Sequence, residues 1–300
     1  MSLLVTGSIG IDTVETPHGR SEDCLGGSAI YFSMAASCFT TVRLVGVAGE
    51  DCPFDFQEVF AGRDIDLQGL ESRNGSKTFR WHGAYSDSMN QRTDTVELNV
   101  LAEAPPLVPP CYRDSQFVFL ANTAPALQQQ LLAQLDGPQL VVADTMKLWI
   151  ENDRPALLQL LQQIDGLVLN DQEALILSGR NNLVPAARDI LSMGPKFVLI
   201  KKGEHGALLL TAADDRFALP AYPTEAVKDP TGAGDAFAGG MMGYLATCQT
   251  AALDDLKRAM AFGTVVASIA IEDFSVNALT KTDKAAIDKR FHQLQEMMQF

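Results

Sequence analysis

The chain has 300 residues, of which 47% are hydrophobic, and this is enough to build a substantial core in one large α/β domain or in two smaller domains. Its 23 basic and 37 acidic side chains give a formal net charge of −14, which argues against nucleic acid or an anionic membrane as the main binding partner. Five cysteines and four histidines are scattered without metal-ligand spacing, so neither a disulfide framework nor a zinc site is predicted.

The first forty residues predict a buried strand, a polar excursion and a buried helix. Residues 2–6 form a short apolar run that is typical of a central strand and too short for a signal peptide or a transmembrane segment, so we expect a cytoplasmic protein. Asp12 follows this strand and is either a contact for ligand hydroxyls or a solvated turn residue. The glycine pair Gly26-Gly27 opens a helix of small and apolar residues, and it either brings a ligand close to the backbone or only makes a tight turn.

Residues 77–100 contain two runs of alternating polar and apolar side chains, which predict a β-ribbon. Together with residues 12–25 this ribbon is expected to form a small sheet over the active site, where it would act as a lid that excludes water. Arg80 and Trp81 are then candidate contacts for a substrate. An ordinary hairpin, with its aromatic residues used for packing, is the alternative.

Continuous apolar strands alternate with helices in the second half of the chain. They are expected at residues 117–120, 140–143, 166–169 and 196–200. This order predicts a mainly parallel sheet that is covered by helices on both faces. Ligands of such sheets bind beyond the carboxyl ends of the strands, so the polar residues there are candidate ligands, although each can equally cap a helix or a turn. These residues are Asn122, Asp144, Asn170 with Glu173, and Lys201-Lys202-Gly203.

Residues 228–240, with the sequence KDPTGAGDAFAGG, combine two carboxylates, a Gly-Ala-Gly turn and the start of an apolar helix. Gly232, Ala233 and Gly234 precede an apolar helix, so free backbone N–H groups and the positive end of the helix dipole are expected to hold an anion. Asp235 lies in the first turn of that helix. A carboxylate beside an anion site suits proton transfer during phosphoryl transfer, and we therefore expect a phosphotransferase.

Other nucleotide-binding classes fit the sequence less well. The chain lacks the GxxxxGK[ST] motif of P-loop proteins, and a dinucleotide fingerprint would need glycine where Phe237 stands. An NAD-dependent oxidoreductase is therefore the weaker alternative. A non-catalytic nucleotide-binding or regulatory module is the other alternative, but it would not need Asp235.

Three motifs resemble those of the ribokinase family, also called the PfkB-type carbohydrate kinases. Residues 229–237 resemble its C-terminal signature, residues 25–29 its N-terminal glycine pair, and residues 170–173 its N-x-x-E motif. The order and spacing of the motifs agree over nearly the whole chain. The resemblance implies a single doubly wound α/β domain over residues 1–300, with a β-lid formed by insertions at about 12–25 and 77–100.

The resemblance also implies the reaction and its cofactors. Members of the family transfer the γ-phosphoryl group of ATP, with Mg²⁺, to a hydroxymethyl group of a sugar or nucleoside. By this resemblance Asp235 is the general base, and the N–H groups of Gly232, Ala233 and Gly234 form the anion hole. The nucleotide and its Mg²⁺ would be held by Asn170, Glu173 (through water), Thr231, Lys202 and Gly203. The acceptor would be held by Asp12, Gly26, Gly27, Arg80 and Trp81.

Three further points stay open at the level of sequence. Asp229 either contributes to a potassium site, as the resemblance implies, or only closes a turn before Pro230. The aromatic residues Trp81 and Tyr85 suit a nucleobase, but a nucleoside (adenosine-like) and a simple sugar such as ribose or fructose remain level as acceptors. An exposed edge of the ribbon would favour a homodimer through the lid.

Overall fold

The structure is a computed structural model that describes residues 2–299, and its centre is a nine-stranded sheet in the order β13-β12-β11-β10-β9-β8-β1-β4-β5. From β11 to β5 every strand is parallel to its neighbours. These strands are β1 (Leu3–Thr6), β4 (Val42–Gly49), β5 (Ile65–Arg73), β8 (Phe117–Leu120), β9 (Leu140–Asp144), β10 (Gly166–Asn170) and β11 (Phe197–Lys201). The hairpin β12 (Ala207–Thr211) and β13 (Arg216–Leu219) completes one edge with antiparallel pairing.

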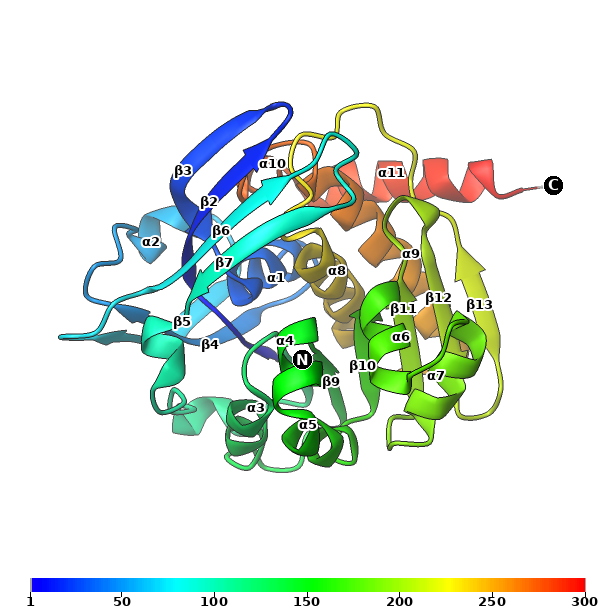
Figure 1. Ribbon diagram of the computed structural model, residues 1–300, viewed down its shortest axis with the longest axis horizontal. Helices are drawn as coiled ribbons and strands as arrows, with labels where there is room; N and C mark the ends of the chain where they lie inside the picture. Colours follow the sequence, from blue (N-terminus) through cyan, green and yellow to red (C-terminus); the bar gives the residue numbers. More distant parts are fainter. Residues whose placement is uncertain (1, 300) are drawn as a thin grey trace.

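Alternate residues of the central strands face two separate cores, because successive side chains of a strand point to opposite faces. In β11, Phe197 and Leu199 join the core against one helical layer, whereas Val198 and Ile200 join the core against the other. Both layers are visible in Figure 1, where helices cover the two faces of the sheet. This arrangement confirms the doubly wound α/β fold that the alternating apolar strands predict.

The first helical layer consists of α1 (Ser28–Ala36), α8 (Ala233–Cys248), α9 (Leu253–Ala270), α10 (Asn277–Thr280) and α11 (Lys284–Met297). The second consists of α3 (Pro125–Leu132), α4 (Lys147–Asn152), α5 (Arg154–Leu161), α6 (Asp171–Ser178) and α7 (Leu183–Leu191). The short elements are α2 (Phe56–Val59), η1 (Asn99–Ala102), η2 (Pro110–Tyr112) and η3 (Gly203–His205). Within residues 2–299, no helix combines the length and the apolar character that crossing a bilayer requires.

A separate four-stranded sheet, called the small sheet below, lies beside the main one in the order β3-β2-β6-β7. Its strands are β2 (Gly10–Thr16), β3 (Gly19–Gly26), β6 (Phe79–Tyr85) and β7 (Arg92–Glu97). The parallel pairing of β2 with β6 joins two excursions that are far apart in the sequence. The blue and cyan strands of Figure 1 therefore form one ribbon, built from the two stretches in which the sequence predicts a lid.

Candidate active site

Polar side chains from distant parts of the sequence line a pocket between the small sheet and the carboxyl ends of the central strands. Five parts of the chain line it: Asp12 on β2, Gly27 and Tyr31 at α1, Phe79, Trp81 and Arg92 on the small sheet, Asn122 to Trp149 between β8 and α4, and Thr231, Gly232 and Asp235 at α8. This is the position at which open parallel sheets bind their ligands. Residues from both ends of the sequence therefore meet at one site.

The loop before α8 has the geometry of an anion site. Gly232 is the N-cap residue of α8 in the left-handed conformation (φ 72°), and a Cβ there would lie 2.3 Å from the Tyr31 ring, so only glycine fits. No side chain caps this helix, and its first turn faces the pocket. Of the three N–H groups expected to form an anion hole, that of Ala233 donates to the Pro230 carbonyl at 3.2 Å. The start of α8 is thus shaped to receive a negative group by its backbone.

Asp235 stands in the first turn of α8 and lines the same pocket. Burial raises the pKa of its carboxyl group, while the positive charges of Lys201 and then Arg92 lower it. A carboxylate whose pKa is raised is a stronger base than an ordinary aspartate, and the two nearby cations keep it available in the ionised form. This environment suits a general base.

Asp12 is the acidic residue on the opposite side of the pocket. It is only 3% exposed, and its Oδ1 atom is buried with no hydrogen-bond partner among the described residues. A Cβ on Gly26 would lie 1.8 Å from Asp12 Oδ2, so this carboxylate rests directly against the glycine pair. Burial, together with the negative charges of Asp229 and Asp235, raises its pKa to about 8. A buried oxygen without a partner at a pocket wall is suited to accept a hydrogen bond from a hydroxyl group of a ligand.

We expect Asp12→Asn to stabilise the ligand-free protein at neutral and alkaline pH. Because the folded-state pKa of Asp12 is raised from 3.8 to about 8, the wild type loses stability as the pH rises through that interval, and the amide variant does not. Urea unfolding from pH 5 to pH 9 should show that the free energy of unfolding of the variant increases relative to that of the wild type as the pH rises. A difference in stability that stays constant with pH would contradict this electrostatic account.

The carboxylates of Asp144 and Glu173 and the ammonium group of Lys201 lie at the ends of β9, β10 and β11. Asp144 is 5% exposed, its Oδ1 atom has no partner among the described residues, and burial and the charge of Asp235 hold its pKa well above the ordinary range. Burial also raises the pKa of Glu173, whereas Lys201 lowers it. Asn170 and Glu173 form a capping box at the start of α6, in which each backbone N–H donates to the side chain of the other residue at 2.8 Å. Both residues therefore cap the helix, as one of the two interpretations of the sequence predicts. The capping box uses only one carboxylate oxygen of Glu173, so the other oxygen can bind another partner.

Asp229 is buried beneath the loop that leads to α8. Its Oδ1 atom accepts the N–H of Thr231 at 2.8 Å, and its Oδ2 atom is buried without a partner among the described residues. The N–H groups of Lys228 and Asp229 donate to the carbonyl of Ile271, which follows α9. The loop before α8 and the segment after α9 therefore lie together, as the potassium hypothesis requires, around a carboxylate oxygen that can still accept a cation.

The small sheet contacts the loop before α8 through its side chains. The Tyr85 hydroxyl lies 3.1 Å from Thr231 Oγ1, and an N–H of Arg92 donates to the same hydroxyl at 3.4 Å. The Arg92 guanidinium also lies over the Trp81 ring, 5.3 Å from its centroid. These contacts show that the face of the small sheet carrying Trp81 and Tyr85 is the one turned toward the pocket.

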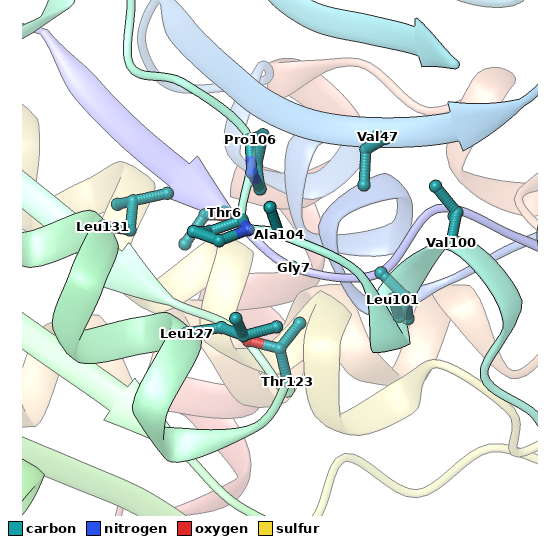
Figure 2. Close-up of a pocket in the computed structure, with 11 residues that line it drawn as sticks. Thr6, Gly7, Val47, Val100, Leu101, Ala104, Pro106, Thr123, Leu127 and Leu131 are labelled. Carbon is teal, nitrogen blue, oxygen red and sulfur yellow. The ribbon is translucent and has the colours of Figure 1, made fainter. Parts of the chain in front are cut away.

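The remaining wall of the pocket is apolar and comes from the segment between β9 and α5. The Trp149 indole N–H donates to Asn122 Oδ1 at 2.9 Å, and Met146 lies beside the amide of the same asparagine. A second, small cavity shares Leu101 and Thr123 with this pocket. In it Leu127 and Leu131 of α3 face Val47 and Val100 (Figure 2). Its lining carries no ionisable side chain, so it offers no chemistry of its own.

Comparison with known proteins identifies the family. The sequence model of the pfkB family carbohydrate kinases matches residues 125–283. A cytidine kinase from Thermococcus kodakarensis is 32% identical over 251 residues, which is 81% of this chain and 88% of that protein. The chain belongs to the pfkB family of carbohydrate kinases. It is therefore a kinase of the sugar and nucleoside class, as its three motifs predict.

Solved structures of other kinases have the same fold as this kinase. A nucleoside kinase from Methanocaldococcus jannaschii superposes with a TM-score of 0.74 at 19% identity, over 97% of this chain and 98% of that one. A ribokinase-type structure from Escherichia coli, determined with ATP and Mg²⁺, superposes with a TM-score of 0.77 at 18% identity, over 97% and 99% of the two chains. The expected ribokinase-like fold is confirmed.

Not every predicted site residue of this kinase reaches the pocket. Arg80 forms an ion pair with Asp23 at 2.8 Å on the other face of the small sheet, because it neighbours Trp81 on one strand and adjacent side chains alternate. Lys202 and Gly203 lie at the start of η3, where the Lys202 N–H donates to the Gly206 carbonyl. Like Lys201, Asn170 and Glu173, they lie outside the lining of this pocket. The structure therefore turns Arg80 away from the pocket. The nucleotide-binding role expected for Lys202 and Gly203 stays a prediction.

Lys201 is a strand-end candidate to which sequence analysis gave no role of its own. It shares the alternation of Phe197 and Leu199, which join the same core as the apolar residues of α8, whereas Lys202 has the opposite parity. Its Nζ atom lies 2.6 Å from the place of a Cβ on Gly234. Counting strand parity from the apolar residues of β11 could have found it.

Proposed function

We propose that this kinase transfers the γ-phosphoryl group of ATP to the hydroxymethyl group of a nucleoside. The observation that carries the proposal is a pocket in which Asp235 and the free end of α8 stand at one end and the aromatic side chains of Phe79, Trp81 and Trp149 line other parts. A planar base has apolar faces that such side chains can stack upon, whereas a free monosaccharide would leave them unused. The similarity to a cytidine kinase supports the same choice.

In the proposed reaction Asp235 accepts the proton of the acceptor hydroxyl as its oxygen bonds to the γ-phosphorus. The bond from that phosphorus to the bridging oxygen breaks, and its electron pair leaves with ADP. Asp12 and Asn122 orient the ribose hydroxyls, so the hydroxymethyl group points toward Asp235. The N–H groups at the start of α8 stabilise the charge on the peripheral phosphoryl oxygens, which is the main task in phosphoryl transfer.

The residues of the strand ends suit a magnesium ion that is held mostly by water and by the phosphates of ATP. Glu173 has one oxygen outside the capping box, and Asp144 has one buried oxygen without a partner among residues 2–299. Hard carboxylate oxygens are the ligands that Mg²⁺ prefers, and protein sites commonly supply only one or two of them. When bound, the ion neutralises charge on the phosphates.

The small sheet is proposed to act as a lid. Tyr85 and Arg92 bring it against Thr231 and Asp235, so its closure would exclude water from the phosphoryl group. Its edge strand β7 is exposed along its whole length. A homodimer through this edge stays a prediction.

An assay that couples ADP release to a panel of nucleosides and sugars tests the proposal. We expect the highest kcat/KM for a ribonucleoside and ADP formation that depends on the acceptor. A preference for free ribose or fructose would show that the acceptor is a sugar and not a nucleoside. Oxidation of reduced nicotinamide without ADP formation would overturn the kinase proposal itself.

We also expect potassium to activate the enzyme through Asp229. A monovalent cation would bind its unpartnered Oδ2 atom together with carbonyl groups near Ile271 and so fix the loop before α8. Activity in potassium chloride should exceed that in N-methylglucamine chloride at the same ionic strength, and Asp229→Asn should abolish the difference. Equal activity in both salts would leave Asp229 as a turn residue only.

A further inference from the structure

The side chain of Lys201 crosses the start of α8 from the neighbouring sheet. Lys201 is the last residue of β11, where it pairs in register with Asn170 at the end of β10. Its Nζ atom is 2.6 Å from the place that a Cβ on Gly234 would take, so the ammonium group occupies space that glycine leaves open. Lys201 is therefore held at the anion loop by the main sheet and not by the small sheet.

This ammonium group has no single partner in the ligand-free protein. Among residues 2–299, no carboxylate lies within 4.0 Å of Lys201 Nζ. Its charge nevertheless reaches Asp235, Asp144 and Glu173, since it lowers the pKa of all three. The cation therefore interacts electrostatically with three carboxylates without a direct ion pair to any of them.

The position is also unfavourable with respect to the helix. The N-terminus of α8 carries the positive end of the helix dipole, where a cation is destabilised and an anion is stabilised. A lysine placed there gains most when an anion binds between it and the helix N–H groups. The arrangement is thus complementary to a ligand with a concentrated negative charge.

We propose that Lys201 binds the γ-phosphoryl group of ATP and remains in contact with it as it is transferred. This inference rests on the proposed kinase function and adds a side-chain cation to the backbone anion hole of Gly232 and Gly234. Lys201 would stabilise the charge on the peripheral oxygens, while Asp235 takes the acceptor proton and the electron pair of the broken bond leaves with ADP. Because it comes from β11, it is in place before the lid closes.

The alternative role is structural, with Lys201 serving only to neutralise Asp144. The two roles differ in what they do to nucleotide binding. A phosphate-binding lysine discriminates ATP from ADP, because ADP lacks the γ-phosphoryl group. A purely structural lysine would change stability and would weaken both nucleotides alike.

Calorimetric titration of the full chain with ATP and with ADP, both in Mg²⁺, separates these roles without any acceptor. We expect Lys201→Met to weaken ATP about 10–100-fold more than ADP, the range for a lost hydrogen bond to a charged group. Lys201→Arg should restore part of the ATP affinity. Lys196→Met, which removes an exposed lysine from the other end of the same sheet region, is the matched control and should bind as the wild type does.

The pH profile gives a second measurement. Since Lys201 lowers the pKa of Asp235, Lys201→Met should move the acid limb of the kcat/KM profile to higher pH. Equal losses for ATP and ADP in Lys201→Met, or no loss, would overturn the inference while leaving the kinase proposal intact. If the γ-phosphoryl preference is lost as expected but no acceptor is phosphorylated, the acceptor proposal fails and the role of Lys201 stands. A wild type that binds neither nucleotide would overturn both.

Discussion

Asp235→Asn is expected to lower kcat by about 10²–10⁴-fold while the protein remains folded, the range typical of losing a general base. The amide keeps the shape of the side chain at the start of α8 but cannot accept the proton of the acceptor hydroxyl. Steady-state kinetics with the best nucleoside measures the loss, and circular dichroism with thermal unfolding shows that the fold is retained.

Asp254→Asn is the matched control for this experiment. Asp254 also lies in the first turn of a helix, but its side chain is 88% exposed and pairs with Lys257 on the surface of α9. It should keep wild-type turnover. Near wild-type turnover in Asp235→Asn would contradict the assignment of Asp235 as the general base. The isosteric amide leaves the anion loop in place, so the substitution removes only the proton acceptor.

Trp149→Ala should raise the KM for a nucleoside about 10–100-fold, since stacking of a base on an aromatic side chain contributes roughly 1–3 kcal/mol. Trp149 lines the proposed acceptor pocket from α4. Its effect on kcat is expected to be smaller, because stacking on the base stabilises the ground state and the transition state alike. Initial rates over a range of nucleoside concentrations measure both constants.

Two comparisons make this result specific. Trp149→Phe keeps an aromatic ring but loses the N–H that donates to Asn122, so it should retain most of the nucleoside affinity. The same Trp149→Ala protein should show a much smaller change in KM for any free sugar that it accepts. Equal losses on nucleosides and sugars would mean that Trp149 supports the pocket without contacting a base.

The features that the sequence predicts well are those encoded locally. Four apolar strands appear where continuous hydrophobic runs predict them, because a strand buried on both faces has few other compositions available. The Gly232-Ala233-Gly234-Asp235 stretch begins a helix as expected, since its glycine permits the left-handed N-cap. Motif and local conformation depend there on the same few residues.

The features that sequence analysis missed depend on tertiary contacts. Helix α4 is six residues long and carries no capping side chain, so no start signal marks it, yet it supplies Trp149 to the pocket. Strand β5 is half-exposed and lacks the continuous apolar run of its neighbours. Arg80 and its neighbour Trp81 were both expected at the site, but strand parity turns only Trp81 toward the pocket. Of the three candidate residues expected at the end of β11, sequence analysis gave roles to Lys202 and Gly203, whereas the structure places the ammonium group of Lys201 beside Gly234.

The most direct test of the account is to identify the product of the reaction by phosphorus NMR. Cytidine is a suitable first acceptor, because a cytidine kinase is similar in sequence over most of this chain. After incubation of the wild-type enzyme with ATP, Mg²⁺ and cytidine, the account predicts equal amounts of ADP and of a phosphomonoester on the hydroxymethyl group of the nucleoside. Inorganic phosphate with unchanged nucleosides throughout the panel, or ATP that is not consumed, would contradict it.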